Sequence, residues 1–98
     1  MILLNHALVF QLKSQKYQIM ALEQTAQSIN LINIKINSPI ALIIGNEVNG
    51  IDSQILNIVD QSIEIPMHGL KESFNVSIAA SMALFYLRYR QDIINSLL

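Results

Sequence analysis

The fold is decided by the segment Ile65–Ala80, which reads IPMHGLKESFNVSIAA. Pro66 ends the apolar run before it, because proline has no amide to donate to a β-ladder. Gly69 permits a sharp turn, and Ser73 stands where a helix N-cap belongs, just before a second apolar run. We therefore predict a strand end, a polar loop and the start of a long helix. An ordinary strand–helix connection has the same parts, but the free amides of a helix N-terminus also bind oxygen-rich groups.

The composition indicates one small, unusually apolar domain. The 98 residues are 52% hydrophobic and 13% charged, whereas charged residues make up about a quarter of an average soluble domain. The longest apolar run near the C-terminus is Met82–Leu87, and a membrane span needs about 18 apolar residues in a row. We expect residues 1–98 to form a single domain of a cytoplasmic protein with no membrane partner, and the apolar excess to cover a partner interface.

The sequence offers few residues for metal or nucleic-acid binding. It has no cysteine, and His6 and His68 lack ligand-like spacing, so we expect no metal site. A net charge of −1 argues against a stand-alone nucleic-acid binder, which usually carries a basic excess. Arg88 and Arg90 are the only clustered positive charges. They are candidates to contact RNA phosphate, although basic residues at a helix end more often complement the helix dipole.

Hydrophobic spacing predicts that helices and strands alternate along the chain. The expected elements are a helix within Met1–Lys16, strands at Tyr17–Leu22, Ile40–Ile44 and Gln61–Ile65, a helical turn and then extended chain within Ser28–Ile36, a short helix capped by Asp52, and a helix from about Asn75 into the nineties. This pattern gives an α/β fold with a mainly parallel sheet and flanking helices. The continuous apolar run Ile40–Ile44 is typical of a central strand.

Three polar loops are expected at the carboxyl ends of the strands, where ligands bind in open parallel sheets. They are Glu23–Ser28, Gly45–Gly50 and Met67–Ser73. The last loop leads into a helix that is apolar on nearly every side, so that it would be buried on every side. A chain this short has too few other elements to cover the helix, and we expect a homodimer with the C-terminal helix in the interface. Its two apolar faces are Val76, Ala79, Ala80, Ala83 and Leu87, and Ile78, Met82, Phe85 and Tyr89.

Two of these loops together resemble a known family. Gly45-Asn46-Glu47 with Gly50 is a weak signal alone, since Asn49-Gly50 is equally a turn. Combined with Asp60 and the segment Ile63–Ala79, it resembles the second and third motifs of the SpoU/TrmH-type RNA 2'-O-methyltransferases of the SPOUT superfamily. Ala21–Thr25 and Ser28 also resemble the preceding strand and loop of the tRNA-modifying branch. The resemblance covers about Gln18 to Arg90 and corresponds to the C-terminal part of the family's catalytic domain.

The resemblance implies a trefoil-knotted α/β fold, an obligate dimer, the cofactor S-adenosylmethionine, and tRNA or rRNA as the substrate for ribose 2'-O-methylation. An apolar slot with a few backbone hydrogen bonds suits adenine. Glu47 would be the structural acid of the second motif, and Ser73 and Asn75 would lie near the methyl-transfer centre. By position, the cofactor-binding residues would be Leu22, Gly45, Ile65, Met67, Leu70 and Phe74.

The sequence departs from the family pattern in two respects, and these departures leave two hypotheses for the function. Phe74 stands where the family usually has leucine, and no arginine precedes Arg88, so the family's N-terminal arginine motif is missing. Transfer requires a deprotonated or aligned hydroxyl. Glu47 and His68 are weak candidates for the general base. Glu47 is better explained as a hydrogen-bond acceptor that fixes its loop, and His68 as an exposed loop residue. We expect an S-adenosylmethionine-dependent RNA methyltransferase, truncated at its N-terminal side. The alternative is a non-catalytic cofactor-binding or dimerisation module.

Overall fold

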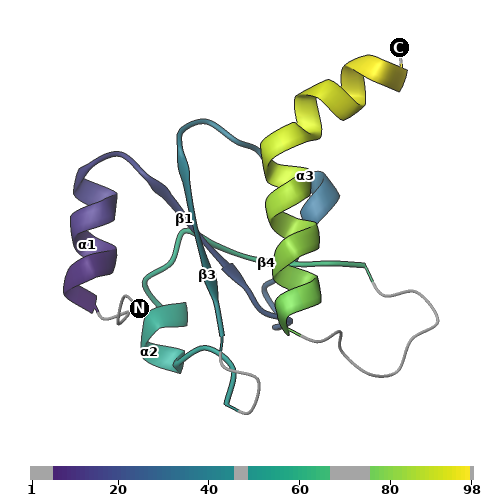
Figure 1. The fold of residues 1–98 in the computed structure, drawn as a ribbon. Helices are drawn as coiled ribbons and strands as arrows, with labels where there is room; N and C mark the ends of the chain where they lie inside the picture. Colours follow the sequence, from purple (N-terminus) through teal and green to yellow (C-terminus); the bar gives the residue numbers. More distant parts are fainter. Residues whose placement is uncertain (1–5, 46–48, 67–75, 98) are drawn as a thin grey trace.

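The architecture is a four-stranded parallel sheet with helices on both faces, as the sequence predicts. The computed structural model describes residues 6–45, 49–66 and 76–97. Within them the strands are ordered β2-β4-β1-β3, and every neighbouring pair is parallel. Helices α1 and α2 lie on one side of the sheet and α3 on the other (Figure 1). The elements are α1 (His6–Ser14), β1 (Gln18–Leu22), β2 (Ile29–Asn30), the 3-10 helix η1 (Leu31–Asn33), β3 (Ile40–Ile44), α2 (Ser53–Leu56), β4 (Gln61–Glu64) and α3 (Val76–Leu97).

Alternate side chains of β1 serve two separate hydrophobic clusters, because successive residues of a strand point to opposite faces. Ile19 and Ala21 pack against Val9 of α1 and Ile55 of α2. Met20 packs on the other face, against Ala83 of α3. All three β1 side chains are at most 1% exposed. The central strand β1 therefore joins the two layers into one domain.

The prediction that Ile40–Ile44 is a central strand is wrong for the described chain. These residues form β3 as predicted, but β3 lies at the sheet edge and pairs only with β1 among the described strands. Ile43 is buried, whereas Ile44 is 47% exposed, and the three residues before them are half-buried. The central positions belong to β1 and β4, each of which has a strand on both sides. Since β3 has only one neighbouring strand among the described residues, its side chains are covered less completely.

Helix α1 ends in a backbone motif that the sequence does not predict. Lys16 takes a left-handed conformation with φ of 70°, and its N–H and that of Tyr17 donate to the carbonyls of Lys13 and Leu12, both at 3.0 Å. This is the Schellman arrangement, which usually has glycine at the left-handed position. The inward side of the helix centres on Val9, while Ala7 is exposed.

The two short connections differ in how well the sequence predicts them. Helix α2 is capped by Asp52 as predicted, since its Oδ1 accepts the N–H of Gln54 at 2.8 Å. In residues 28–36 the predicted order is wrong, because the extended pair of β2 comes before the helical turn and not only after it. The Asn30 side chain caps η1 by accepting the N–H of Ile32 at 3.0 Å. A side-chain cap explains why the turn starts later than expected.

Helix α3 packs one face on the sheet and leaves the other uncovered. Ala80 and Ala83 are 6% and 0% exposed, and small side chains let the helix approach the sheet closely. The opposite face, which we call the α3 stripe, is 42–60% exposed and consists of Ile78, Met82, Phe85 and Tyr89. Within the described part of the chain, no helix is long and apolar enough to cross a membrane.

The assignment of Arg88 and Arg90 to a helix end is wrong. Helix α3 continues to Leu97, and its last turn contains no basic residue. The dipole effect is confined to about the last turn, so it does not explain these arginines. The Arg88 guanidinium instead lies 5.4 Å from the centre of the Tyr89 ring, a distance suited to a cation–π contact.

Candidate functional site

Three of the predicted cofactor-binding positions converge at the carboxyl edge of the sheet. Leu22, the last residue of β1, is paired with Ile44 of β3 on one side and Ile63 of β4 on the other. Gly45 directly follows β3, and Ile65 directly follows β4. All of the predicted positions that the structure describes, Leu22, Gly45 and Ile65, are half-buried. The strand order therefore places them side by side, across β4, β1 and β3.

The other predicted site residues lie outside the described residues. They are Glu47, Met67, Leu70, Ser73, Phe74 and Asn75, together with His68. The roles that the resemblance implies for them stay predictions. The described site therefore consists of the strand ends and the residues that tie these ends together.

Glu23 connects three elements at this edge. Its N–H donates to the carbonyl of Ile63 in β4 at 3.1 Å, and its own carbonyl accepts the hydroxyl of Ser28. Its carboxylate oxygen Oε2 accepts the N–H of Ile51 at 2.9 Å, a contact between residues 28 positions apart. The Glu23 side chain thus joins the end of β1 to the end of the loop that follows β3.

The two ends of that loop pack directly against each other, backbone on backbone. A Cβ atom added to Gly45 would lie 2.6 Å from the carbonyl carbon of Gly50 and 2.8 Å from the amide nitrogen of Ile51. Gly50 itself has φ of +68°, and a Cβ there would meet Glu23 Oε2 at 2.8 Å. Gly45 has no room for a side chain, because the atoms that its Cβ would meet belong to the backbone. At Gly50 the Cβ would meet the end of the flexible Glu23 side chain, and it is the left-handed backbone that favours glycine there.

The loop after β1 is closed by hydrogen bonds of its own. The N–H of Thr25 donates to Oγ of Ser28 at 2.8 Å, and the N–H of Ser28 donates to the carbonyl of Thr25 at 3.2 Å. The hydroxyl of Ser28 then reaches back to the carbonyl of Glu23. Such side chain–backbone bonds fix a short turn. The predicted Glu23–Ser28 loop is therefore an ordered turn beside the strand ends.

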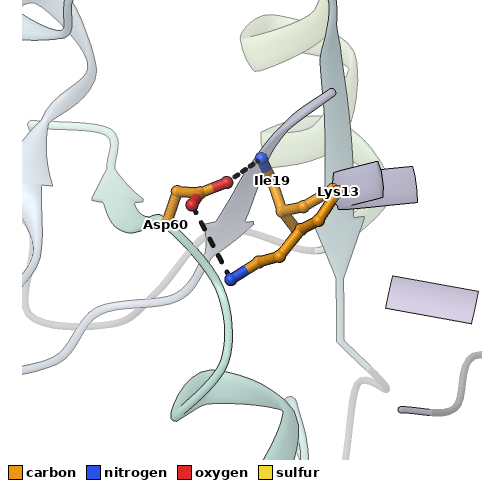
Figure 2. A network of polar contacts seen from close by, with 3 residues as sticks. All are labelled: Lys13, Ile19 and Asp60. Atoms are coloured by element: carbon orange, nitrogen blue, oxygen red, sulfur yellow. Dashed lines mark hydrogen bonds and ion pairs between the residues drawn. The ribbon is translucent and has the colours of Figure 1, made fainter. Parts of the chain in front are cut away.

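A second polar cluster lies at the opposite, amino end of the same strands (Figure 2). Oδ2 of Asp60 accepts the N–H of Ile19 at 2.6 Å, and Lys13 Nζ lies 3.7 Å from Oδ1 of Asp60. The backbone N–H of Asp60 donates to the carbonyl of Ile19 at 2.9 Å. These contacts complete the pairing of β1 with β4. They lie away from the edge where ligands bind in parallel sheets.

Sequence reasoning missed the roles of Glu23, Ser28 and Ile51. Glu23 and Ser28 were assigned to a polar loop, and Ile51 was given no role. The available signal was a carboxylate immediately after an apolar strand, in the same chain as a glycine-rich loop after the neighbouring strand. A carboxylate can accept backbone N–H groups in charge-assisted hydrogen bonds. The pattern does not reveal which amide it reaches.

Chemically, this arrangement suits an organic ligand held by backbone groups and apolar walls. Leu22 and Ile65 pack on the hydrophobic cluster around Met20 and Ile63, so they present partly buried apolar surface at the strand ends. Among the described residues, no group of three His, Cys, Asp or Glu side chains lies close enough to hold a metal ion. Fold and site together define a parallel α/β protein in which a glycine-containing loop closes against the carboxyl ends of the central strands.

The chain belongs to the SpoU rRNA methylase family, whose family model matches residues 5–85. It is 37% identical over 89 residues to a tRNA (guanosine(18)-2'-O)-methyltransferase of Borreliella burgdorferi, which covers 89% of this chain and 41% of that relative. The resemblance noted in the sequence is thereby confirmed at the level of the family.

Solved structures of similar proteins agree with the fold. The TrmH/SpoU tRNA modifying enzyme of Aquifex aeolicus matches with a TM-score of 0.77 and 29% identity, over 91% of this chain and 45% of that one. An AdoMet-bound rRNA methyltransferase from Sinorhizobium meliloti matches with a TM-score of 0.75 and 25% identity, over 88% of this chain and 33% of that one. The chain thus spans less than half the length of these relatives.

Proposed function

We propose that this chain binds S-adenosylmethionine at the carboxyl edge of its sheet and takes part in 2'-O-methylation of ribose in tRNA or rRNA. The observation that carries the proposal is the convergence of Leu22, Gly45 and Ile65 at one sheet edge in a member of the SpoU family. The matched relatives are named as tRNA or rRNA methyltransferases. With an RNA substrate of this kind, the protein would act in the cytoplasm.

The residues present fit the proposed cofactor. Adenine needs apolar contacts and a few backbone hydrogen bonds, and the half-buried Leu22 and Ile65 beside Gly45 provide a surface of this kind. When bound, S-adenosylmethionine would supply the methyl group as an electrophile. The protein's part would be to orient that group against the ribose hydroxyl and to keep water away from it. The turn Thr25–Ser28 and the Glu23 contact support this by ordering the loops.

The residues proposed for the transfer step are Glu47, Ser73 and Asn75, with Met67, Leu70 and Phe74 completing the cofactor pocket. They remain assignments from the family resemblance. The alternative of a non-catalytic module is not favoured, because the matched relatives are named as methyltransferases. We also propose that residues 1–98 form one domain corresponding to the C-terminal part of the family's knotted methyltransferase domain, since the chain spans 41% of the Borreliella relative.

Isothermal titration calorimetry of the chain with S-adenosylmethionine tests the cofactor assignment. We expect saturable binding, and S-adenosylhomocysteine should compete for the same site. Absence of binding at about 1 mM ligand, which corresponds to a binding free energy weaker than about −4 kcal/mol, would contradict the assignment.

Transfer is tested separately with methyl-labelled cofactor and unmodified tRNA or rRNA transcripts. Methylation of a ribose 2'-hydroxyl removes the nucleophile for alkaline cleavage, so the label should be recovered in an alkali-resistant dinucleotide. Label released as a mononucleotide would indicate base methylation and contradict the proposed position. Cofactor binding without any transfer would instead support the non-catalytic alternative.

We further propose that the α3 stripe joins two copies of this chain into a homodimer. Phe85 and Ile78 are 60% and 55% exposed, and the Phe85 and Tyr89 rings are 5.1 Å apart between centres. A contiguous, aromatic-rich apolar surface of this kind is typical of protein interfaces. The stripe lies opposite the helix face that packs on the sheet, so a second copy would meet it without disturbing the core.

The dimer is tested by light scattering coupled to gel filtration. We expect the unmodified chain to elute at the mass of a dimer, and Phe85→Glu to shift it to the monomer, because a buried charge without a partner is costly. Leu84→Glu is the matched control, since Leu84 is also exposed, at 56%, but lies outside the stripe. A monomeric unmodified chain, or equal effects of the two variants, would contradict this interface.

A further inference from the structure

The side chain of Glu23 links the loop that follows β1 to the segment that closes the loop after β3. Its Oε2 accepts the N–H of Ile51 at 2.9 Å, and this amide belongs to the residue that follows the left-handed Gly50. Ile51 is 8% exposed and packs in the cluster with Ala21 and Ile43. Its side chain is therefore anchored in the core, and Glu23 fixes the backbone immediately before it.

Gly45 packs against the peptide that this contact holds. The backbone of Gly50 and Ile51 lies so close to Gly45 that a Cβ on Gly45 would be 2.6–2.9 Å from three of their atoms. Gly45 thus rests on the segment that the Glu23 carboxylate holds. The main chain of Glu23 is fixed in turn, because its N–H bonds to Ile63 and its carbonyl bonds to Ser28. The end of β1 is therefore joined, through the Glu23 side chain, to the Gly50–Ile51 peptide against which Gly45 packs.

We infer that Glu23 is a positioning residue for the cofactor pocket, which sets the location of the Gly45 backbone by holding the Gly50–Ile51 peptide. This inference rests on the proposed function, because Gly45 is a predicted cofactor contact. Glu23 acts through Gly45 and has no assigned contact with substrate or cofactor. What it requires at position 23 is a hydrogen-bond acceptor at the right reach, and a formal negative charge is not required.

Three variants separate this role from the alternatives. Glu23→Ala removes the acceptor. Glu23→Gln removes the charge but keeps a side-chain oxygen at the same reach, so it should rescue the contact. Gln24→Ala is the matched control, because Gln24 is the exposed neighbour in the same loop and the same number of atoms beyond Cβ is removed. For each variant we would measure the Kd of S-adenosylmethionine by calorimetry and the amide hydrogen exchange of Ile51 by NMR.

We expect Glu23→Ala to weaken cofactor binding by about tenfold and to speed exchange of the Ile51 amide by about tenfold or more, from the loss of one charge-assisted bond. Glu23→Gln should stay within about threefold of the unmodified chain in both measurements, since an amide oxygen still accepts the bond. Gln24→Ala should leave both unchanged. Thermal unfolding of each variant shows that the domain is folded under the conditions of measurement.

Several outcomes would overturn the inference. Unchanged Ile51 exchange in Glu23→Ala would show that the contact does not hold the loop. Faster exchange with unchanged cofactor affinity would show that the contact does not serve the pocket. Equal damage in Glu23→Gln and Glu23→Ala would show that charge is what matters. If the unmodified chain fails to bind S-adenosylmethionine, the proposed function fails, and the exchange measurement alone then decides whether Glu23 holds the Gly50–Ile51 peptide.

Discussion

Glu23 and Asp60 are carboxylates with similar bonds at opposite ends of the same sheet. Glu23 follows β1 and accepts the N–H of Ile51 at 2.9 Å, and Asp60 precedes β4 and accepts the N–H of Ile19 at 2.6 Å. The two amides belong to different parts of the structure. The Ile19 amide belongs to a strand residue that is 0% exposed, whereas the Ile51 amide belongs to the closing segment of a loop. The same bond therefore has different consequences at the two ends.

The comparison separates what stabilises this fold from what serves its site. At the amino end, the carboxylate completes the pairing of two central strands, so its loss should lower stability and leave ligand binding intact. At the carboxyl end, the carboxylate positions a loop where ligands bind in parallel sheets. Its loss should change affinity more than stability. Variants at the two ends test this distinction.

Gly45→Val should have the largest effect, at the carboxyl end. The added Cβ would meet backbone atoms of Gly50 and Ile51 at 2.6–2.9 Å, and backbone cannot move aside as the end of a flexible side chain can. We expect the loop to be displaced and the affinity for S-adenosylmethionine to fall at least about a hundredfold, or about 2.7 kcal/mol. Ala26→Val, in the neighbouring loop at an exposed position, is the control. Cofactor affinity that survives Gly45→Val would place the site elsewhere.

Asp60→Ala should have the next largest effect, at the amino end and on stability alone. It leaves the N–H of Ile19 without its acceptor in a buried strand, which costs about 1–3 kcal/mol. For a domain of about this size, each kcal/mol lowers the melting temperature by about 4–8 °C. Asp60→Asn should recover most of this loss, because its amide oxygen still accepts. A change in cofactor affinity comparable to that of Glu23→Ala would remove the distinction between the two ends.

How far the sequence predicts these two ends depends on how local the signals are. The strand Ile40–Ile44 was predicted with its observed bounds, because a run of apolar residues between Pro39 and Gly45 is a local pattern. Its edge position was missed, since neighbours in a sheet are set by the whole chain. The Glu23–Ile51 bond spans 28 positions, and no periodicity encodes a contact of that kind. The cap at Asp52, which spans two positions, was predicted correctly.

Ser28→Ala should have a moderate effect, again at the carboxyl end. The change removes the acceptor for the N–H of Thr25 at 2.8 Å and the donor to the carbonyl of Glu23. We expect a loss of about 1 kcal/mol in unfolding free energy and a cofactor Kd raised about two- to threefold, because the turn supports Glu23 only indirectly. Ser53→Ala on α2, where the serine is exposed, is the matched control. If Ser28→Ala weakens binding more than Glu23→Ala, the turn and not the carboxylate positions the pocket.

Lys13→Met should have the smallest effect and tests which contact of Asp60 matters. Lys13 Nζ lies 3.7 Å from Asp60 Oδ1, and the two side chains are 32% and 42% exposed. An exposed ion pair of this kind contributes about 0–1 kcal/mol, and salt at about 1 M, with a Debye length of about 3 Å, should remove the charge-dependent part of the difference from the unmodified chain. The hydrogen bond from Ile19 to Oδ2 does not involve Lys13 and should persist. A loss as large as that of Asp60→Ala, measured by urea unfolding at low and high salt, would show that the amino end is held by the charge pair and not by the backbone bond.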